Sequence, residues 1–384
     1  MGGRLREGWF SQLFGFPEAI ALREKGGEGV RARIELRADG TLTSRVNGFT
    51  LGAGVFSTPS LGQLREQAGA ARRGPLTLRH LATRDVFEMH SRPELAGATF
   101  MAASQFNALE FPSPNVTPDD GVSGYSADPT QGPACALAAP GATVLRNYFV
   151  PMEDGSTGQT AERQLNLLAD VLLAVQGCAG DEPADDKLPL VEVRNGYTNS
   201  DEARLRSFNA ALCSAAAPAP DDLLSLLRIG LHVDVEVPWG PERFVLRPQA
   251  EWQRVNQVFC SALACGYSDG SLEAWEPLAR LVLRGAYEAT LLAAALYGGR
   301  RADTDADPPV VLLTFLGGGV FCNPDEWIEQ ALAESLAAVE ARGIALDVVV
   351  THFGAVDEVK AARIGKEVLF ARAALRRAQQ VDEE

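Results

Sequence analysis

The sequence is poor in the residues that build metal centres and disulfide frameworks. Its 384 residues include six cysteines and four histidines. They form no CxxC, HxH or HExxH pattern. Scattered thiols are typical of reduced cytosolic proteins, whereas zinc sites and disulfide-stapled folds need ligands at defined spacings. We therefore expect no metal site and no disulfide framework.

The sequence also lacks an excess of basic charge and any long apolar run. Lysine and arginine total 35 against 50 acidic residues, and the formal net charge is -15. Because a nucleic-acid surface needs a basic stripe, we expect no nucleic-acid partner. No apolar run reaches the ~20 residues of a membrane span, and the N-terminus carries no signal-type apolar core. We expect a cytoplasmic protein with no membrane partner.

The most informative segment begins at residue 310. Residues 310–316 (VVLLTFL) are apolar or β-branched and too few for an ordinary helix, which predicts a strand buried on both faces. Glycines follow, and Asn323 as N-cap with Pro324 suits a helix start. Such a junction offers backbone N–H groups to a phosphate or pyrophosphate. The predicted loop comprises Gly317, Gly318, Gly319, Val320, Phe321 and Asn323. A glycine turn without a ligand is the alternative.

Apolar runs alternate with helical patterns through the last third of the chain. Strands are predicted at 255–264, 309–316 and 346–350, and helices at 272–296, 325–342 and 358–380. Further strands are predicted at 76–81, 98–103 and 231–237, and a β-hairpin at 30–46. This order favours an α/β fold in which right-handed crossovers build a parallel core.

A long loop, residues 104–133, follows the strand predicted at 98–103. Long ordered loops are most often functional. Asn107 offers an amide that can hydrogen-bond vicinal ribose hydroxyls. Hydrolysis of a glycosidic bond needs a carboxylate that activates water or protonates the leaving group. The loop carries four carboxylates, those of Glu110, Asp119, Asp120 and Asp128. Capping of neighbouring N–H groups in turns is the alternative role for the three aspartates.

The strand-end asparagine with its glycine-bearing loop, together with the later segment 317–321, resembles macrodomains and the related poly(ADP-ribose) glycohydrolases. The phrases TQGPAC at 130–135 and RNYF at 146–149 look like a divergent branch related to bacterial effector hydrolases that act on arginine-linked ADP-ribose. The resemblance implies a three-layer macrodomain-like fold with a mixed, largely parallel central sheet. It also implies an N-terminal accessory segment at 1–75 and a catalytic domain at 76–384 with a helical insertion around 151–240.

The resemblance further implies residue roles, since in those families the first loop embraces the distal ribose and the second holds the pyrophosphate. The implied ligand-binding residues are Asn107, Gly121, Val122, Tyr125, Gln131, Gly317, Gly318, Gly319, Val320, Phe321, Asn323 and Phe353. Tyr125 either covers the distal ribose or anchors the loop, and Phe353 either stacks on adenine or packs in the core. Poly(ADP-ribose) glycohydrolases carry two adjacent glutamates where Gln131 and Gly132 stand here. The implied acid is therefore Asp128, with Asp120, Asp119 and Glu110 as substitutes.

The function that the resemblance implies is an ADP-ribosyl hydrolase that removes ADP-ribose from modified protein side chains, with arginine as one possible linkage. The implied partner is ADP-ribose or an ADP-ribosylated protein, a ubiquitin-type target being one option, and no cofactor is expected. Two alternatives remain open. One is a non-catalytic module that only binds ADP-ribose, and the other is a phosphatase or other hydrolase of a free ADP-ribose derivative.

Overall fold

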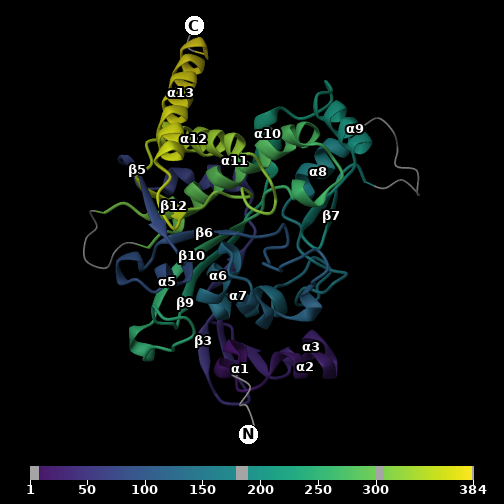
Figure 1. The fold of residues 1–384 in the computed structure, drawn as a ribbon, viewed down its shortest axis with the longest axis vertical. Coiled ribbons are helices and arrows are strands. Elements are labelled where there is room, and N and C mark those ends of the chain that lie inside the picture. Colours follow the sequence, from purple (N-terminus) through teal and green to yellow (C-terminus); the bar gives the residue numbers. More distant parts are fainter. Residues whose placement is uncertain (1–7, 179–188, 300–306, 383–384) are drawn as a thin grey trace.

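A seven-stranded sheet crosses the middle of the molecule (Figure 1). The computed structural model describes residues 8–178, 189–299 and 307–382. The strand order in this sheet is β4-β9-β10-β6-β11-β12-β5. The strands are β4 (Val55–Ser57), β5 (Leu76–Thr83), β6 (Thr99–Ala103), β9 (Gly230–Val237), β10 (Gln253–Cys260), β11 (Val310–Leu313) and β12 (Leu346–Phe353).

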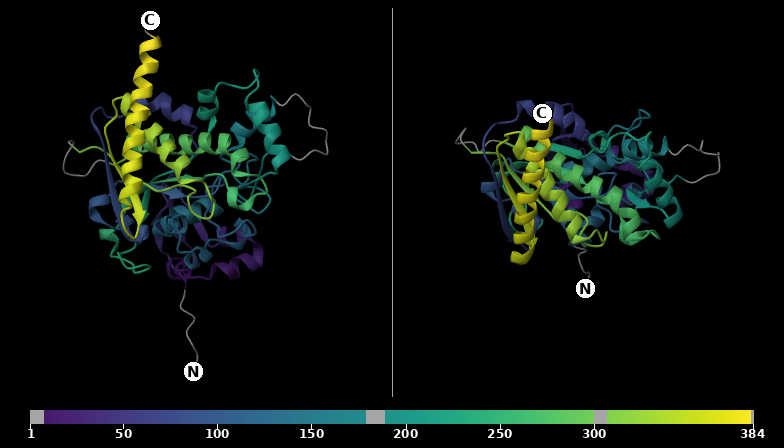
Figure 2. Two further views of the ribbon diagram at one scale, coloured as in Figure 1. Left: turned by 45° about the horizontal axis from the view of Figure 1, so that its top comes forward. Right: turned by 90° about the horizontal axis from the view of Figure 1, so that it is seen from above.

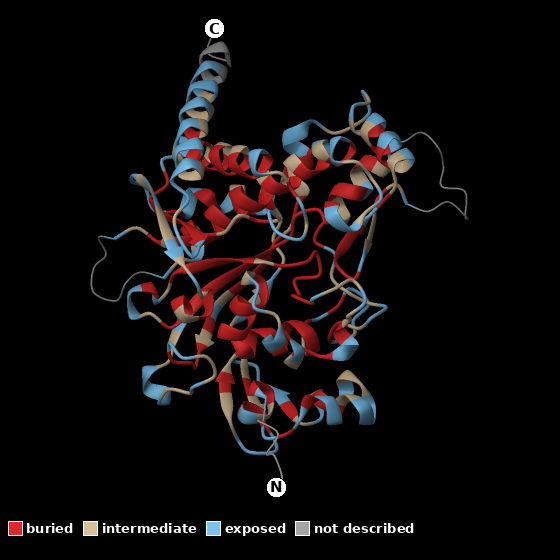
Figure 3. Ribbon diagram, viewed as in Figure 1, coloured by how far each residue is buried: buried red, intermediate tan, exposed pale blue. Residues whose placement is uncertain are grey.

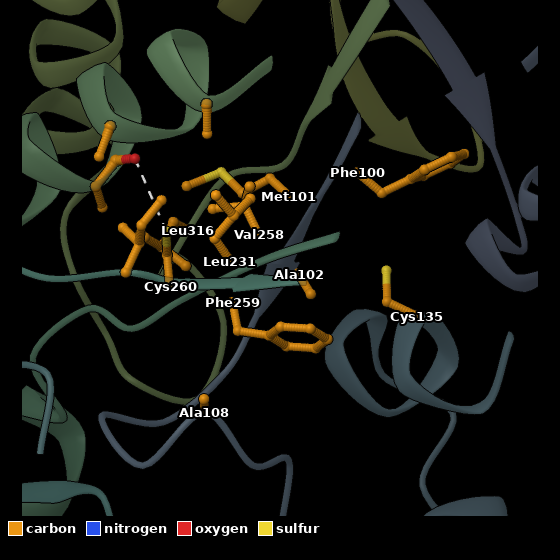
Figure 4. Packing of buried hydrophobic residues seen from close by; sticks show 14 of the residues in the cluster. Phe100, Met101, Ala102, Ala108, Cys135, Leu231, Val258, Phe259, Cys260 and Leu316 are labelled. Atoms are coloured by element: carbon orange, nitrogen blue, oxygen red, sulfur yellow. Dashed lines mark hydrogen bonds between the residues drawn. The ribbon is translucent and has the colours of Figure 1, made fainter. Parts of the chain in front are cut away.

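The sheet is mixed but largely parallel. Strands β10, β6, β11, β12 and β5 run parallel to one another, whereas β9 is antiparallel to β10 and β4 is antiparallel to β9. Apolar side chains fill both faces, and Val258 and Phe259, neighbours on β10, point to opposite sides of the sheet (Figure 4). The predicted α/β class with a mixed, largely parallel central sheet is confirmed.

Helices cover both faces of the sheet and complete three layers (Figures 1 and 2). Helices α11 and α12 lie on one face, with α4, α10 and α13 packed against them, and α5, α6 and α7 lie on the other. Their bounds are α4 (Leu61–Gln67), α5 (Val86–His90), α6 (Gln131–Ala138), α7 (Pro140–Tyr148), α10 (Pro220–Leu226), α11 (Leu272–Tyr297), α12 (Asp325–Ala341) and α13 (Glu358–Asp382). Buried residues are concentrated in the sheet and the helices next to it, whereas α13 projects into solvent (Figure 3).

The N-terminal segment packs against α7 and the long loop. It comprises α1 (Trp9–Phe14), α2 (Glu18–Lys25), α3 (Gly27–Arg31) and an antiparallel sheet of β1 (Ile34–Leu36), β2 (Thr41–Ser44) and β3 (Thr50–Gly52). The predicted hairpin at 30–46 is present as β1 and β2, but its first residues belong to α3. Strand β4 of the same segment joins the central sheet beside β9. The extension is therefore continuous with the sheet, and the boundary at residue 75 stays a prediction.

The segment between α7 and β9 is irregular. It holds α8 (Ala169–Gln176), α9 (Glu202–Leu212) and a two-stranded sheet of β7 (Glu192–Arg194) and β8 (Tyr197–Asn199), with α10 after them. Part of the expected insertion at 151–240 is not helical, because β9 belongs to the central sheet. No helix in the described part of the chain is long and apolar enough to cross a membrane.

Candidate functional site

A cavity of about 370 Å³ opens beside the carboxyl ends of β6, β10 and β11. Ligands of open α/β sheets bind at this edge, next to the central strands. The loops after β6 and β11 supply most of the wall. They are about 200 residues apart in the sequence but adjacent in space, because β6 and β11 are neighbours in the sheet. The wall consists of Ala103, Ser104, Gln105, Glu110, Phe111, Pro112, Asp128, Thr130, Gln131, Gly132, Pro133, Tyr197, Ala262, Tyr267, Thr314, Phe315, Leu316, Gly317, Gly319, Val320 and Phe321.

The glycine loop after β11 is held from behind by Tyr287 on α11. The Tyr287 hydroxyl donates to the Thr314 carbonyl at 2.8 Å and accepts from the Leu316 N–H at 3.0 Å. Gly317 has φ of 76°, and a Cβ there would lie 2.4 Å from the Cβ of Ala262, so only glycine fits. Asn323 closes the loop, because its N–H bonds the Gly317 carbonyl at 3.0 Å.

The glycine loop has backbone N–H groups that no acceptor in the described chain satisfies. Within the described chain, the N–H groups of Gly319, Val320 and Phe321 have no hydrogen-bond acceptor. All three residues line the cavity. Neighbouring backbone donors of this kind form a binding site for an anion.

Gln105 folds the loop after β6 back on itself. Its amide nitrogen donates to the Phe111 carbonyl at 2.6 Å, and its amide oxygen accepts from the Phe111 N–H at 3.2 Å. This pair of bonds turns residues 106–109 away from the cavity and brings Glu110 to its wall. Neither Gln105 nor Ser104 was assigned a role from the sequence, although both lie in the segment that the sequence singles out.

Glu110 is a wholly buried carboxylate in the cavity wall. Its Oε1 accepts from the Ser104 hydroxyl at 3.1 Å, and its Oε2 lies 3.1 Å from Nη2 of Arg146. Burial raises the pKa of Glu110 to about 7, although Arg146 and the Ser104 bond oppose the rise. A carboxyl group with a pKa near neutrality can exchange a proton at physiological pH, which is typical of acid–base groups.

Asp128 is the second carboxylate of the cavity. It is half-buried and precedes α6, where its Oδ1 accepts from the Thr130 N–H at 2.9 Å. Gln131, the first residue of α6, also lines the cavity, but both ends of its amide bind strand β6: the oxygen accepts from Ala103 N–H and the nitrogen donates to the Met101 carbonyl, each at 2.7 Å. Asp128 therefore has fewer hydrogen bonds to the protein than either Gln131 or Glu110.

Aromatic rings form the opposite side of the cavity. Tyr197 lies edge-on to Tyr267 and Phe321, with ring centroids 5.3 and 5.5 Å apart, and Tyr267 is partly exposed. Only Phe321 was predicted here. The two tyrosines come from β8 and from the turn after β10, and nothing in their local sequence points to the site.

The structure does not place Asn107 in the cavity. Asn107 is fully buried, its Oδ1 accepts from the Leu109 N–H at 3.0 Å, and its Nδ2 donates to Gln164 Oε1 at 2.8 Å. The expected contact with the ribose is therefore corrected, because both ends of this amide stabilise the folded loop.

Asp119 and Asp120 also lie away from the cavity and have the alternative role, that of turn residues. Asp119 accepts from the Ala161 N–H, and Asp120 caps the short turn that begins after Thr117. Their expected part in catalysis is not supported by these positions.

Gly121, Val122 and Tyr125 contact the N-terminal segment and the back of the site. Glu18 accepts from the Val122 N–H at 3.0 Å, and a Cβ on Gly121 would lie 2.6 Å from the same carboxylate. The buried Tyr125 hydroxyl accepts from the Glu110 N–H at 2.9 Å. Tyr125 therefore anchors the loop, which was one of its two predicted roles.

Three predicted residues of the second half lie outside the cavity wall. Gly318 faces Ile328, and the Asn323 side chain donates to the Leu263 carbonyl at 2.8 Å. The prediction that Asn323 caps the helix is wrong, since α12 begins after Pro324 without a side-chain cap. Phe353 is 86% exposed at the end of β12, so its alternative as a core residue is also wrong.

The described residues contain no group of three or more side chains suited to hold a metal ion. No protein-family model matches the chain, and no curated protein matches it significantly. Solved structures of poly(ADP-ribose) glycohydrolases do match. The enzyme from Deinococcus radiodurans in complex with ADP-ribose is 12% identical, with a TM-score of 0.38 over 82% of this chain and 94% of that one. The enzyme from Thermomonospora curvata is 14% identical, with a TM-score of 0.41 over 91% and 98%.

A second structure of the Thermomonospora curvata enzyme, bound to the inhibitor ADP-HPD, is 15% identical with a TM-score of 0.39. It covers 90% of this chain and 97% of that one. At these identities and TM-scores the likeness assigns neither an activity nor a substrate to this chain. The function must come from the residues of the cavity.

Proposed function

We propose that this protein hydrolyses an ADP-ribosyl linkage on a protein side chain and releases ADP-ribose. One observation carries the proposal: a single cavity combines free backbone N–H donors with two carboxylates. The donors suit a diphosphate, and the carboxylates suit cleavage of a glycosidic bond. The sequence resemblance to macrodomains supports the same ligand.

The glycine loop binds the diphosphate in this proposal. The N–H groups of Gly319, Val320 and Phe321 donate to phosphate oxygens, and Tyr287 keeps the loop in shape. None of the described residues in the cavity wall is a lysine, an arginine or a histidine. Recognition of the anion therefore depends on backbone donors and not on a cationic side chain.

The carboxylates carry out the bond cleavage. Water attacks the anomeric carbon of the distal ribose while Asp128 takes a proton from it, the C–O or C–N bond to the protein breaks, and the same proton passes to the leaving group. Asp128 is the group that contacts the substrate, because its side chain is the freer of the two. Glu110, in the wall, stabilises the positive charge that develops on the sugar ring and accepts a proton when needed.

The charge of the cavity favours one linkage class. Next to the two carboxylates the described wall has no basic side chain, which favours a cationic group at the bond to be cleaved, whereas the backbone donors of the glycine loop receive the anionic diphosphate. A guanidinium-linked ADP-ribose presents such a cation at the bond to be cleaved. We therefore propose arginine-linked ADP-ribose as the substrate, with the carrier protein left open.

The test is the substitution Asp128→Asn, with Asp120→Asn as the matched control. Both change one loop aspartate to its near-isostere, but only Asp128 lines the cavity. Release of ADP-ribose from proteins modified on arginine, on acidic residues or on serine is measured for each variant, with calorimetry for ADP-ribose binding. We expect Asp128→Asn to lose about 10²–10⁴-fold in rate while it still binds ADP-ribose.

The outcomes separate the candidate functions. Full turnover by Asp128→Asn with loss in Asp120→Asn would move the acid–base role along the loop. Tight ADP-ribose binding without release from any linkage by the unmodified protein would identify it as a non-catalytic module that binds ADP-ribose. The complete burial of Glu110 is the observation that favours this second candidate.

A further inference from the structure

Arg146, on α7, is a buried cation behind the cavity. Its side chain has no exposed area, and its guanidinium stacks on the Phe259 ring of β10, 3.5 Å from the ring centroid. A buried charge is costly unless it is paired and hydrogen-bonded, and an apolar side chain of similar volume often serves stability as well or better. The position of Arg146 therefore needs an explanation beyond packing.

Two of the contacts of Arg146 converge on the loop that presents Glu110. Its Nε donates to the Ala108 carbonyl at 2.9 Å, and its Nη2 donates to Glu110 Oε2 at 3.1 Å. Arginine presents these donors in one rigid plane, so the two acceptors are fixed relative to each other. The third nitrogen, Nη1, has no hydrogen-bond partner within the described chain.

Ala108 is held in a strained conformation. Its φ is 57°, in the left-handed region that residues other than glycine rarely occupy. Such strain persists only where surrounding contacts impose it. The bond from Arg146 to the Ala108 carbonyl is one such contact, and it fixes the backbone two residues before Glu110.

Both carboxylate oxygens and the backbone N–H of Glu110 are thereby held in place. Arg146 holds one carboxylate oxygen, Ser104 holds the other, and Tyr125 accepts from the backbone N–H. The other titratable groups near Glu110 are Tyr125 and Cys135, and burial raises the pKa of each well above its ordinary value, so both are neutral at physiological pH. Among the residues that the structure describes, Arg146 is therefore the charged group in contact with this carboxylate.

We propose that Arg146 is a positioning residue for the reaction: it sets the orientation and the ionisation of Glu110, and it does not contact the substrate. This inference rests on the proposed function. Removal of the guanidinium leaves Glu110 buried without its counter-charge, so the carboxyl group takes up a proton and loses its ability to stabilise positive charge.

The experiment compares Arg146→Met and Arg146→Lys with Arg65→Met. Arg65 is the matched control, because it pairs with the buried carboxylate of Glu288 at 2.7 Å, and neither residue lines the cavity. The protonation of Glu110 is followed by carbon-13 NMR of glutamate-labelled protein, with its signal assigned from Glu110→Gln. The pH profile of ADP-ribose release is measured in parallel.

We expect Arg146→Met to raise the pKa of Glu110 by more than about one unit, because an opposite charge at this range lowers a carboxyl pKa by 1–3 units. The pH profile should shift in the same direction, kcat should fall more than KM rises, and Arg146→Lys should restore part of the rate. Arg65→Met should lower the stability and leave both titrations unchanged.

Unchanged titration of Glu110 in a folded Arg146→Met variant would overturn the inference. If Arg146→Met does not fold, Arg146→Gln, which also removes the charge, decides by the same readouts. If the unmodified protein releases no ADP-ribose, the proposed function fails, whereas the NMR titration still decides whether Arg146 controls the state of Glu110.

Discussion

Individual residues of the glycine loop have different tasks that a sequence cannot separate. Gly317 is required by the backbone, since it has a positive φ and no room for a side chain. Gly318 packs on Ile328 and lies outside the cavity wall. Gly319 alone has no atom within 4 Å of the position that a Cβ would occupy, and it lines the cavity.

This difference gives a sharper test of the phosphate loop than a change at Gly318. We expect Gly319→Val to fold normally, because its side chain meets open space, and to bind ADP-ribose at least about tenfold more weakly, or ~1.4 kcal/mol. Calorimetry and a denaturant titration measure the two quantities. Gly69→Val is the control, since that glycine also has open space around it and lies outside the cavity wall. Normal affinity in a folded Gly319→Val protein would remove the loop from the binding site.

The carboxylates of the long loop show how far residue types alone can lead. The sequence correctly indicates a carboxylate-bearing loop at a strand end, and two of its four carboxylates, Glu110 and Asp128, line the cavity. The sequence could not show that Gln105 bonds both polar atoms of the Phe111 backbone. That closure reverses the direction of the loop. It buries Asn107 away from the cavity and places Glu110, three residues later, in the cavity wall.

At the scale of elements, the N-terminal segment helps to hold the site. Glu18, on α2, is buried and accepts from the N–H groups of Val122 and Ser123 and from the Tyr148 hydroxyl, at 3.0, 2.7 and 2.7 Å. These bonds fix the long loop between Glu110 and Asp128. The segment expected to be an accessory layer therefore supports the loop that carries both carboxylates.

We predict that Glu18→Gln lowers the free energy of unfolding by about 1.5–3 kcal/mol, because an amide cannot replace a carboxylate that accepts three hydrogen bonds. Hydrogen exchange should rise in residues 117–128 before it rises in the sheet. Glu24→Gln on the same helix is the control, because Glu24 is exposed and its ion pair with Arg33 contributes little. Protection of the long loop equal to that of the unmodified protein would contradict this assignment.

The strands were easier to predict than the helices around the site. The run at 310–313 and residues 348–350 of the strand at 346–353 are apolar, and most of them are β-branched, because helices cover both faces of the sheet. Helices α6 and α7 were missed, since nearly every residue in them is buried and no polar face marks a helical period. The spacing of apolar residues at 162–175 predicts a helix over that range, but α8 begins only at Ala169, because the Leu167 N–H bonds the Phe106 carbonyl instead.

At the scale of the whole molecule, strand order creates the site. β6 lies between β10 and β11, so three loops that are far apart in sequence meet at one edge. The alternation of strands and helices predicts a parallel core, but it does not fix which strands are neighbours. The aromatic wall from Tyr197 and Tyr267 could therefore not be predicted, because it depends on how β8 and the turn after β10 are packed.

Buried histidines should make the stability of the whole protein fall in mild acid. His90 stacks on Phe100 with ring centroids 3.7 Å apart, and its Nδ1 bonds the Val86 carbonyl at 2.8 Å. Burial lowers its pKa to about 4, and burial also lowers the pKa of His232. Unfolded histidines take up protons below about pH 6.5, whereas folded His90 resists protonation until about pH 4 and burial opposes the protonation of His232 as well, so acidification favours the unfolded chain.

Glu110 affects the pH dependence of stability in the opposite direction to the histidines. Its pKa is raised in the folded protein, so its contribution to stability is complete below pH 4.5 and is lost as the pH rises through 7. Between pH 6.5 and 4.5 it therefore offsets one of the two histidines. Each group changes the free energy of unfolding by at most about 1.4 kcal/mol per pH unit.

We predict that His90→Asn, whose amide can replace the Nδ1–H donor, flattens the fall in unfolding free energy between pH 6.5 and 4, and that Glu110→Gln makes it steeper. Denaturant titrations at half-unit pH steps measure the slopes, which are independent of any constant loss of stability caused by the substitution itself. Equal slopes for His90→Asn and the unmodified protein would mean that His90 takes up its proton in the folded state as readily as in the unfolded chain. In that case the ring could not be locked between Val86 and Phe100 as the structure has it.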